Sequence, residues 1–206
     1  MRRLVLLLAF ICLVFGGAAL AFAQSDLPAR QEEEMTPFRK SYWAIELTRN
    51  FPASYSQNLF SPGGYFPTIR YLHNLDANWM MGVGGGFKML NRRPETAGAQ
   101  LTAKFGPTLA ILTLSHETLY VVRLYHPTYL LLGPRLLYML PTTAARLPFQ
   151  RDPYYASEIG GAFTAQLVRL VGERGMLTFR VGRWRGTKTT RLQGFEAAIG
   201  YAMSMD

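Results

Sequence analysis

The segment GFEAAIGYAMSM, residues 194–205, gives the clearest indication of the fold, because its residue types alternate between two faces. Phe195 and Ile199 lie on one face with other apolar residues, whereas Glu196 and Gly200 lie on the other face with small residues. Side chains alternate between the two sides of an extended chain, whereas along a helix they recur every 3.6 residues. The segment is therefore predicted to be a β-strand with one large apolar face and one small, sparsely charged face.

The same alternation recurs along the chain and predicts further strands. These strands are expected at residues 42–48, 64–73, 79–89, 98–106, 128–140, 157–167 and 176–182. Each is near the ~9–11 residues that a tilted strand needs to cross a bilayer. After residue 23, every run of 18 residues contains a polar break, so helical membrane spans are not expected.

The composition of the two faces indicates which one would contact lipid. Small residues with scattered charges suit a narrow interior better than a solvated exterior, and opposite charges inside can pair. The polar residues expected in this lumen are Glu46, Arg70, Lys88, Lys104, Arg135, Glu158, Arg180 and Glu196. We therefore predict an all-β, transmembrane, antiparallel up-and-down β-barrel of about eight strands. A soluble barrel or sandwich with an apolar core is the alternative fold.

Residues 107–127 are too apolar for a plain turn. They could extend the fourth strand and begin the fifth early, with the turn at residues 115–118. They could also form an added hairpin, which would give a barrel of about ten strands. The pattern leaves both possibilities open.

The N-terminal residues predict export. Arg2 and Arg3 precede an apolar run over residues 4–20, and Ala21-Phe22-Ala23 fits the small-x-small pattern of a cleavage site. Cys12, the single cysteine, lies inside this run, so the mature chain would form no disulfide. Residues 1–23 are therefore predicted to be a cleavable signal peptide.

The remaining chain divides into two parts. Residues 24–40 are charged and lack periodicity, so we expect a flexible periplasmic tail, and residues 41–206 form the predicted barrel of the outer membrane. If the mature chain starts in the periplasm, the short links at 74–78 and 172–175 are periplasmic turns. The external loops are then residues 52–62, 91–97, 141–153 and 186–191.

Aromatic residues gather near the predicted strand ends, as in the interfacial belts of membrane barrels. The inner belt would contain Trp43, Trp79 and Tyr201, and the outer belt Tyr65, Tyr138, Tyr155 and Trp184.

The charge balance suggests an anionic surface as a partner. The chain carries 22 Lys and Arg against 13 Asp and Glu. For an exported protein, anionic lipid is a better counterpart than nucleic acid, so we expect no nucleic-acid partner. Cations in or beside the external loops could bind lipopolysaccharide phosphates, although a solvated loop surface would explain them equally well. The possible lipopolysaccharide-contacting residues are Arg92, Arg93, Arg146, Arg151, Arg185, Lys188 and Arg191.

With these features, residues 41–206 resemble the small outer-membrane barrel families, namely the transmembrane domain of the OmpA type and the OmpX and OmpW types. The last strand is similar to the assembly signal of such barrels, which has a polar residue, a glycine and alternating apolar residues. Here these are Glu196, Gly200, Tyr201, Met203 and Met205, although the chain closes on Met205-Asp206 instead of Phe or Trp. The resemblance implies a monomer that meets the barrel-assembly machinery during biogenesis and then outer-membrane lipid.

No set of residues predicts catalysis. Ser115, His116 and Glu117 are consecutive, but in a strand His116 points away from both neighbours and cannot relay a proton between them. The histidines His73, His116 and His126 lack metal-ligand spacing. We therefore expect no catalytic residue, metal or cofactor, and a structural or interaction role. The alternatives are a narrow channel for small solutes and a lipid A-modifying enzyme.

Overall fold

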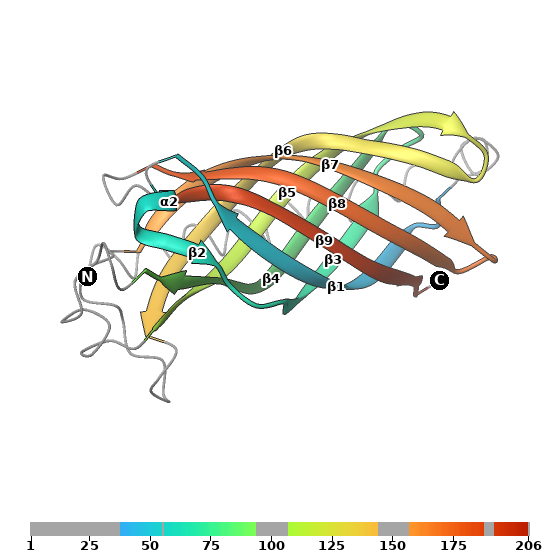
Figure 1. Cartoon of the computed structure of the whole chain (residues 1–206). Coiled ribbons are helices and arrows are strands. Elements are labelled where there is room, and N and C mark those ends of the chain that lie inside the picture. The colour runs from blue at the N-terminus through green and yellow to red at the C-terminus, as the bar shows by residue number, and fades with distance from the viewer. Residues whose placement is uncertain (1–37, 55, 94–106, 144–156, 188–191, 206) are drawn as a thin grey trace.

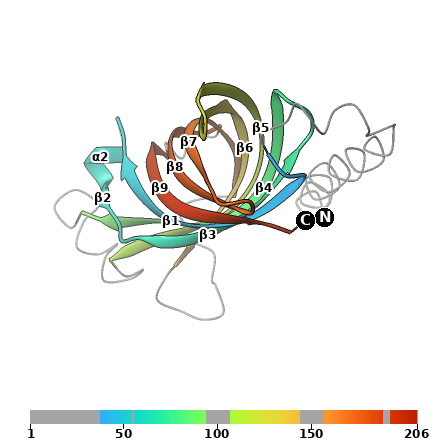
Figure 2. The same cartoon turned by 90° about the vertical axis from the view of Figure 1, so that its right-hand side faces the viewer.

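The computed structural model describes residues 38–54, 56–93, 107–143, 157–187 and 192–205. Its strands surround a common axis (Figures 1 and 2). The elements are β1 (Ser41–Pro52), α2 (Ser56–Leu59), β2 (Phe60–Pro62), β3 (Phe66–Asn74), β4 (Trp79–Arg92), β5 (Thr108–Tyr125), β6 (Thr128–Thr143), β7 (Glu158–Val171), β8 (Gly175–Gly186) and β9 (Gln193–Ser204).

The pairing of the strands closes the sheet into a barrel. Every strand from β3 to β8 pairs antiparallel with the next one along the chain, and the first strand β1 pairs with both β3 and the last strand β9. The short strand β2 adds only to the end of β4. Over the described ranges, eight strands therefore form the wall and β2 is an extra strand. The predicted all-β up-and-down barrel is confirmed.

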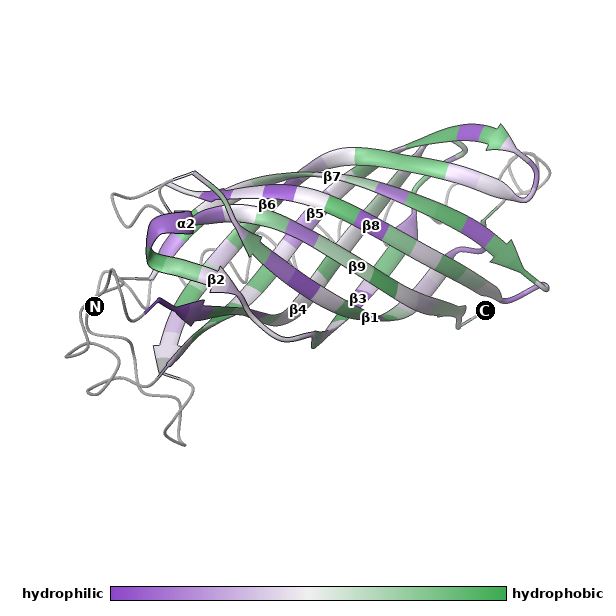
Figure 3. Ribbon diagram, viewed as in Figure 1, coloured by the Kyte–Doolittle hydropathy of each residue, from purple (hydrophilic) through white to green (hydrophobic). Residues whose placement is uncertain are grey.

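The large apolar side chains face outward along this wall. Phe163, Phe179 and Ile199 are 58%, 50% and 62% exposed, as expected for residues in contact with lipid. Figure 3 shows hydrophobic and hydrophilic residues alternating along the same strands. The alternative of a soluble fold with these residues in its core is therefore wrong. Phe105, which shares their pattern in the sequence, lies outside the described residues.

The turn that the sequence allowed at residues 115–118 does not form, because β5 is one uninterrupted strand. These residues pair with β4 on one side and with β6 on the other. The chain reverses instead at His126 and Pro127, which a cis peptide bond joins. Over the described ranges, the barrel therefore has eight wall strands without an added hairpin. The expected strand at residues 98–106 lies outside the described part of the chain.

The connections differ in length at the two ends of the barrel. The turn end has the short links after β3, β5 and β7, and the loop end has the longer links after β1, β4 and β6. Helix α2 and β2 lie at the loop end, whereas the C-terminus lies at the turn end (Figure 1). This division agrees with the expected turns and loops, and the described ranges contain no helix long and apolar enough to span a bilayer.

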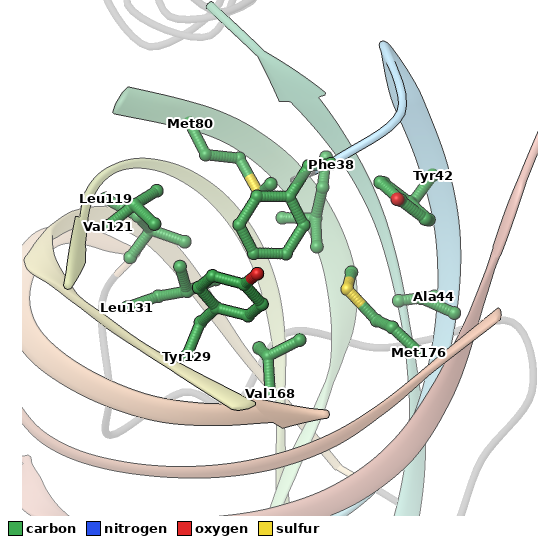
Figure 4. Packing of buried hydrophobic residues seen from close by; sticks show 12 residues of the cluster. Phe38, Tyr42, Ala44, Met80, Leu119, Val121, Tyr129, Leu131, Val168 and Met176 are labelled. Carbon is green, nitrogen blue, oxygen red and sulfur yellow. The ribbon is translucent and has the colours of Figure 1, made fainter. Parts of the chain in front are cut away.

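Large apolar residues also fill both ends of the lumen, where the alternation pattern led us to expect mainly small and charged residues. The cluster at the turn end includes Phe38, whose ring centre lies 4.9 Å from that of Tyr129 (Figure 4). Phe38 is thus buried although it belongs to the segment expected to be a flexible tail. The cluster at the loop end includes Leu90, Ile111 and Trp184.

Trp184 was expected in the outer aromatic belt, and that placement is wrong. Its side chain is 0% exposed because position 184 shares the inward face of β8 with Thr178 and Arg180. In contrast, Trp43 and Trp79 are exposed near the turn end, as the inner belt predicted.

Candidate functional site

The middle of the lumen holds the charged side chains of the barrel. Glu46 on β1 and Glu196 on β9 occupy inward-facing positions, because each alternates with exposed apolar neighbours along its strand. Glycines on adjacent strands make room for them. A Cβ atom at Gly200 would lie 2.7 Å from Cγ of Glu46, and one at Gly182 would lie 3.4 Å from Oε1 of Glu196. Small residues therefore allow long charged side chains to reach the barrel axis.

Arg70 on β3 connects two carboxylates. Its Nη1 is paired with Glu46, and its Nε donates a hydrogen bond of 2.8 Å to Oε1 of Glu117 on β5. Nη1 also donates to Oε1 of Gln166 on β7 at 3.0 Å. One guanidinium thus joins side chains from three other strands.

Arg180 on β8 extends this chain to the second half of the lumen. Its Nε and Nη2 donate to Oε2 of Glu46 at 3.0 and 2.7 Å, and its Nη1 is paired with Glu196. Glu196 in turn is paired with Lys88 on β4 and Arg135 on β6. All eight wall strands therefore contribute one side chain to a continuous network, which we call the lumen network. Its members are Glu46, Arg70, Lys88, Glu117, Arg135, Gln166, Arg180 and Glu196.

The lumen network is almost closed to solvent. Each of its side chains is buried, and burial of charges is tolerated only where opposite charges and hydrogen bonds compensate for lost hydration. A cavity of about 10 Å³ remains beside Lys88, Arg135 and Glu196, which is room for about one water molecule. With an apolar cluster on either side, this arrangement fills the barrel and favours a closed interior over a channel.

The sequence pattern placed most of the lumen residues on the correct face. The structure brings together Glu46, Arg70, Lys88, Arg135, Arg180 and Glu196. Glu158 is also buried, but at the loop end beside Gly186. Lys104 lies outside the described residues.

Sequence reasoning missed Glu117 and Gln166. Gln166 shares the inward face of β7 with Thr164. Glu117 shares the inward face of β5 with Thr113 and Ser115, and this alternation was the available signal. His116 occupies the opposite face, as expected, so Ser115, His116 and Glu117 form no relay. Within the described ranges, no group of three potential ligands could hold a metal ion.

The basic residues expected in external loops occupy different environments. Arg92 ends β4, is only 7% exposed and donates from Nη1 to the carbonyl oxygen of Thr108 at 3.4 Å, so its expected exposure is wrong. The side chain of Arg93 is exposed, and its Nε donates to the carbonyl oxygen of Phe60 at 3.2 Å. Arg185 is exposed on the outer face of β8. The remaining members, Arg146, Arg151, Lys188 and Arg191, lie outside the described residues.

Two further cations, which the loop-based reasoning missed, lie on the outer wall. Arg183 is exposed two residues before Arg185 on β8, and Arg49 is half-buried on the outer face of β1. The sequence could have revealed both residues, because each is a cation among the apolar residues of the outward face, close to the loop end of its strand.

Comparisons with known proteins bear on the fold. No family model matches the chain, and no curated protein matches its sequence. The crystal structure of Neisserial surface protein A matches with a TM-score of 0.60 and 12% identity, covering 80% of this chain and 97% of that one. The outer membrane protein OprG from Pseudomonas aeruginosa matches with a TM-score of 0.56 and 6% identity, covering 82% and 98%. The chain therefore has the fold of the small outer-membrane β-barrels, as its sequence resemblance predicted.

Proposed function

We propose that this protein is a non-enzymatic β-barrel of the outer membrane that acts through its outer surface and binds lipopolysaccharide at its loop end. The observation that carries the proposal is the filled lumen between two apolar clusters, combined with a wall of exposed apolar side chains. A barrel whose interior is occupied by its own side chains acts through its wall, its loops or its effect on the membrane.

The outer wall supports residence in a bilayer. Large apolar residues on every wall strand are exposed, whereas soluble monomers rarely expose a large continuous apolar surface. The predicted signal peptide at residues 1–23 would bring the chain to the periplasm, from which such a barrel inserts.

Cations at the loop end support the lipopolysaccharide component. Arg93 and Arg185 are exposed there, and guanidinium groups form strong, charge-assisted hydrogen bonds with phosphate. Lipopolysaccharide carries such phosphates next to its acyl chains. Its phosphates would therefore match the cations at the loop end, and its acyl chains would match the apolar side chains of the wall.

The test begins with the complete chain expressed in a Gram-negative host. We expect it in the outer-membrane fraction, with a gel mobility that shifts on boiling. Purified protein in a planar bilayer should give no conductance steps, and in detergent it should retain lipopolysaccharide. A soluble protein would contradict the membrane assignment, regular conductance steps would favour the channel, and failure to bind lipopolysaccharide would remove that component. Modified lipid A in expressing cells, detected by mass spectrometry, would contradict the non-enzymatic role.

A further inference from the structure

Cations and aromatic rings alternate on the outer wall of β8, β9 and β1 at the loop end. Arg183 on β8 is paired with Phe195 on β9, and Phe195 is paired with Phe51 on β1. One outward-facing row closer to the turn end, Arg49 is paired with Ala197. Adjacent strands lie about 4.8 Å apart, so the long side chains of Arg49 and Arg183 can reach a common ligand above the small Ala197.

The aromatic rings support two of these guanidinium groups. The guanidinium carbon of Arg49 lies 5.5 Å from the ring centre of Phe51 and 5.3 Å from that of Tyr65. The guanidinium carbon of Arg183 lies 5.7 Å from the ring centre of Phe195. A cation–π contact of this kind orients a guanidinium while leaving its N–H groups available to an acceptor.

These outer cations lack the compensation that the lumen cations have. Arg70, Lys88 and Arg180 each contact a carboxylate, whereas among the residues that the structure describes neither Arg49 nor Arg183 forms an ion pair. Nε of Arg49 is moreover buried without a hydrogen-bond partner. Buried donors are normally satisfied, so the protein compensates the guanidinium of Arg49 less completely than it compensates the lumen cations.

The surface beside these cations is hollowed. Gly161 on β7 is paired with Arg185 on β8, and a Cβ atom at Gly161 would meet nothing within 4 Å. A shallow, open depression is lined by Gly161, Arg185, Gly186 and Thr187. A headgroup can therefore approach Arg185 from the side of the barrel.

The apolar band begins directly next to the cations. The next outward-facing row toward the turn end is apolar. In it, Ile199 on β9 is paired with Leu47 on β1 and with Phe179 on β8, and all three side chains are exposed. Arginine on a barrel wall costs about 0–1 kcal/mol near the membrane interface, compared with about 2–4 kcal/mol at the midplane. Cations just above an apolar band are thus suited to a ligand with a phosphate headgroup and acyl chains.

We infer that this wall patch, made of Arg49, Phe51, Tyr65, Arg183, Arg185 and Phe195, binds one lipid A phosphate of a lipopolysaccharide molecule. The acyl chains lie against Leu47, Phe179 and Ile199. The inference rests on the proposed function and deepens it, because it places the binding site on the barrel wall instead of the loops.

Binding of defined lipids to the purified complete chain tests the wall patch. The probes are bisphosphorylated lipid A, dephosphorylated lipid A and phosphatidylglycerol, measured by native mass spectrometry in detergent. The variant R49A/R183A/R185A should bind bisphosphorylated lipid A at least about tenfold more weakly than the wild type, because it loses charge-assisted hydrogen bonds. Dephosphorylated lipid A and phosphatidylglycerol should bind the wild type weakly.

Two control variants separate the wall patch from other cations. R169A removes an exposed outer-wall arginine near the turn end, and R123A removes an exposed arginine near the turn end of β5. Both should bind lipid A as the wild type does. A gel shift on boiling checks that each variant folds, and R183Q replaces the triple variant if the latter does not fold.

The outcomes distinguish the inference from the proposed function. If the wild type and the triple variant bind lipid A equally, the wall patch is wrong while the proposed function stands. Loss of binding in R93A, which removes the exposed cation that follows β4, with unchanged binding in the triple variant would place the site at the loops. Equal binding of phosphatidylglycerol would refute selectivity for lipid A. If the wild type binds no lipid A, both the inference and the lipopolysaccharide component of the proposed function fail.

Discussion

Replacing Glu196 with glutamine should destabilise the barrel strongly, because Glu196 is paired with three buried cations. Lys88, Arg135 and Arg180 would lose this counter-charge in a region that has room for about one water. Three hydrogen bonds to charged groups at about 1.5–3 kcal/mol each give an upper bound near 5–9 kcal/mol. Contacts in one network are not additive, and the amide oxygen still accepts one hydrogen bond. We therefore expect a loss of about 3–5 kcal/mol, as for other broken buried pairs.

The assay is reversible urea unfolding of the complete chain in lipid vesicles, followed by tryptophan fluorescence and by the gel shift. The matched control is E173Q, which removes an exposed carboxylate in the turn between β7 and β8. The control should change the free energy of unfolding by less than about 0.5 kcal/mol. A change below about 1 kcal/mol in E196Q would contradict the dependence of the lumen cations on Glu196, since it would mean that water or mobile ions compensate their charge.

Three further substitutions test the packing of the barrel. G133A should abolish the heat-dependent gel shift, because its Cβ atom would lie 1.8 Å from the carbonyl oxygen of Thr118. The control G161A should fold normally, because its Cβ atom would meet nothing within 4 Å. A folded G133A would contradict the close approach of the two strands. F38A should lower the free energy of unfolding in urea by about 3–5 kcal/mol through loss of a buried ring, and an unchanged value would show that the residue does not stabilise the turn end. F179R should cost about 2–4 kcal/mol in vesicles because Phe179 faces outward near the middle of β8, and wild-type stability would place this position away from lipid.

The strands that were predicted correctly are those whose two faces differ in chemistry. In β9, large outward residues alternate with small or charged inward ones, so one segment revealed both the strand and its orientation. In β5 the pattern failed because Leu109, Ile111, Leu119 and Val121 face inward and fill the ends of the lumen. With both faces apolar at its ends, this strand lost the contrast on which the prediction depended.

The candidate site was predictable residue by residue but not as a network. Alternation assigned Glu46, Arg70 and Glu196 to the lumen, whereas their contacts depend on the stagger of strands that are far apart in sequence. Trp184 was misplaced because the belt argument used its height along the strand and ignored its face. Arg49 was overlooked because a single cation on an apolar strand face gives no periodic signal.

Assembly order follows from the way the lumen network is distributed over the chain. Arg180 on β8 forms ion pairs with Glu46 on the first strand and with Glu196 on the last strand. Both ion pairs are therefore present only after β9 has paired with β1. A nascent barrel missing its final strand holds Lys88, Arg135 and Arg180 with a deficit of negative charge. Seam closure and completion of the lumen network are consequently one event. The open intermediate carries the larger excess of positive charge, and the closed barrel is the first state in which each cation of the network has a carboxylate partner.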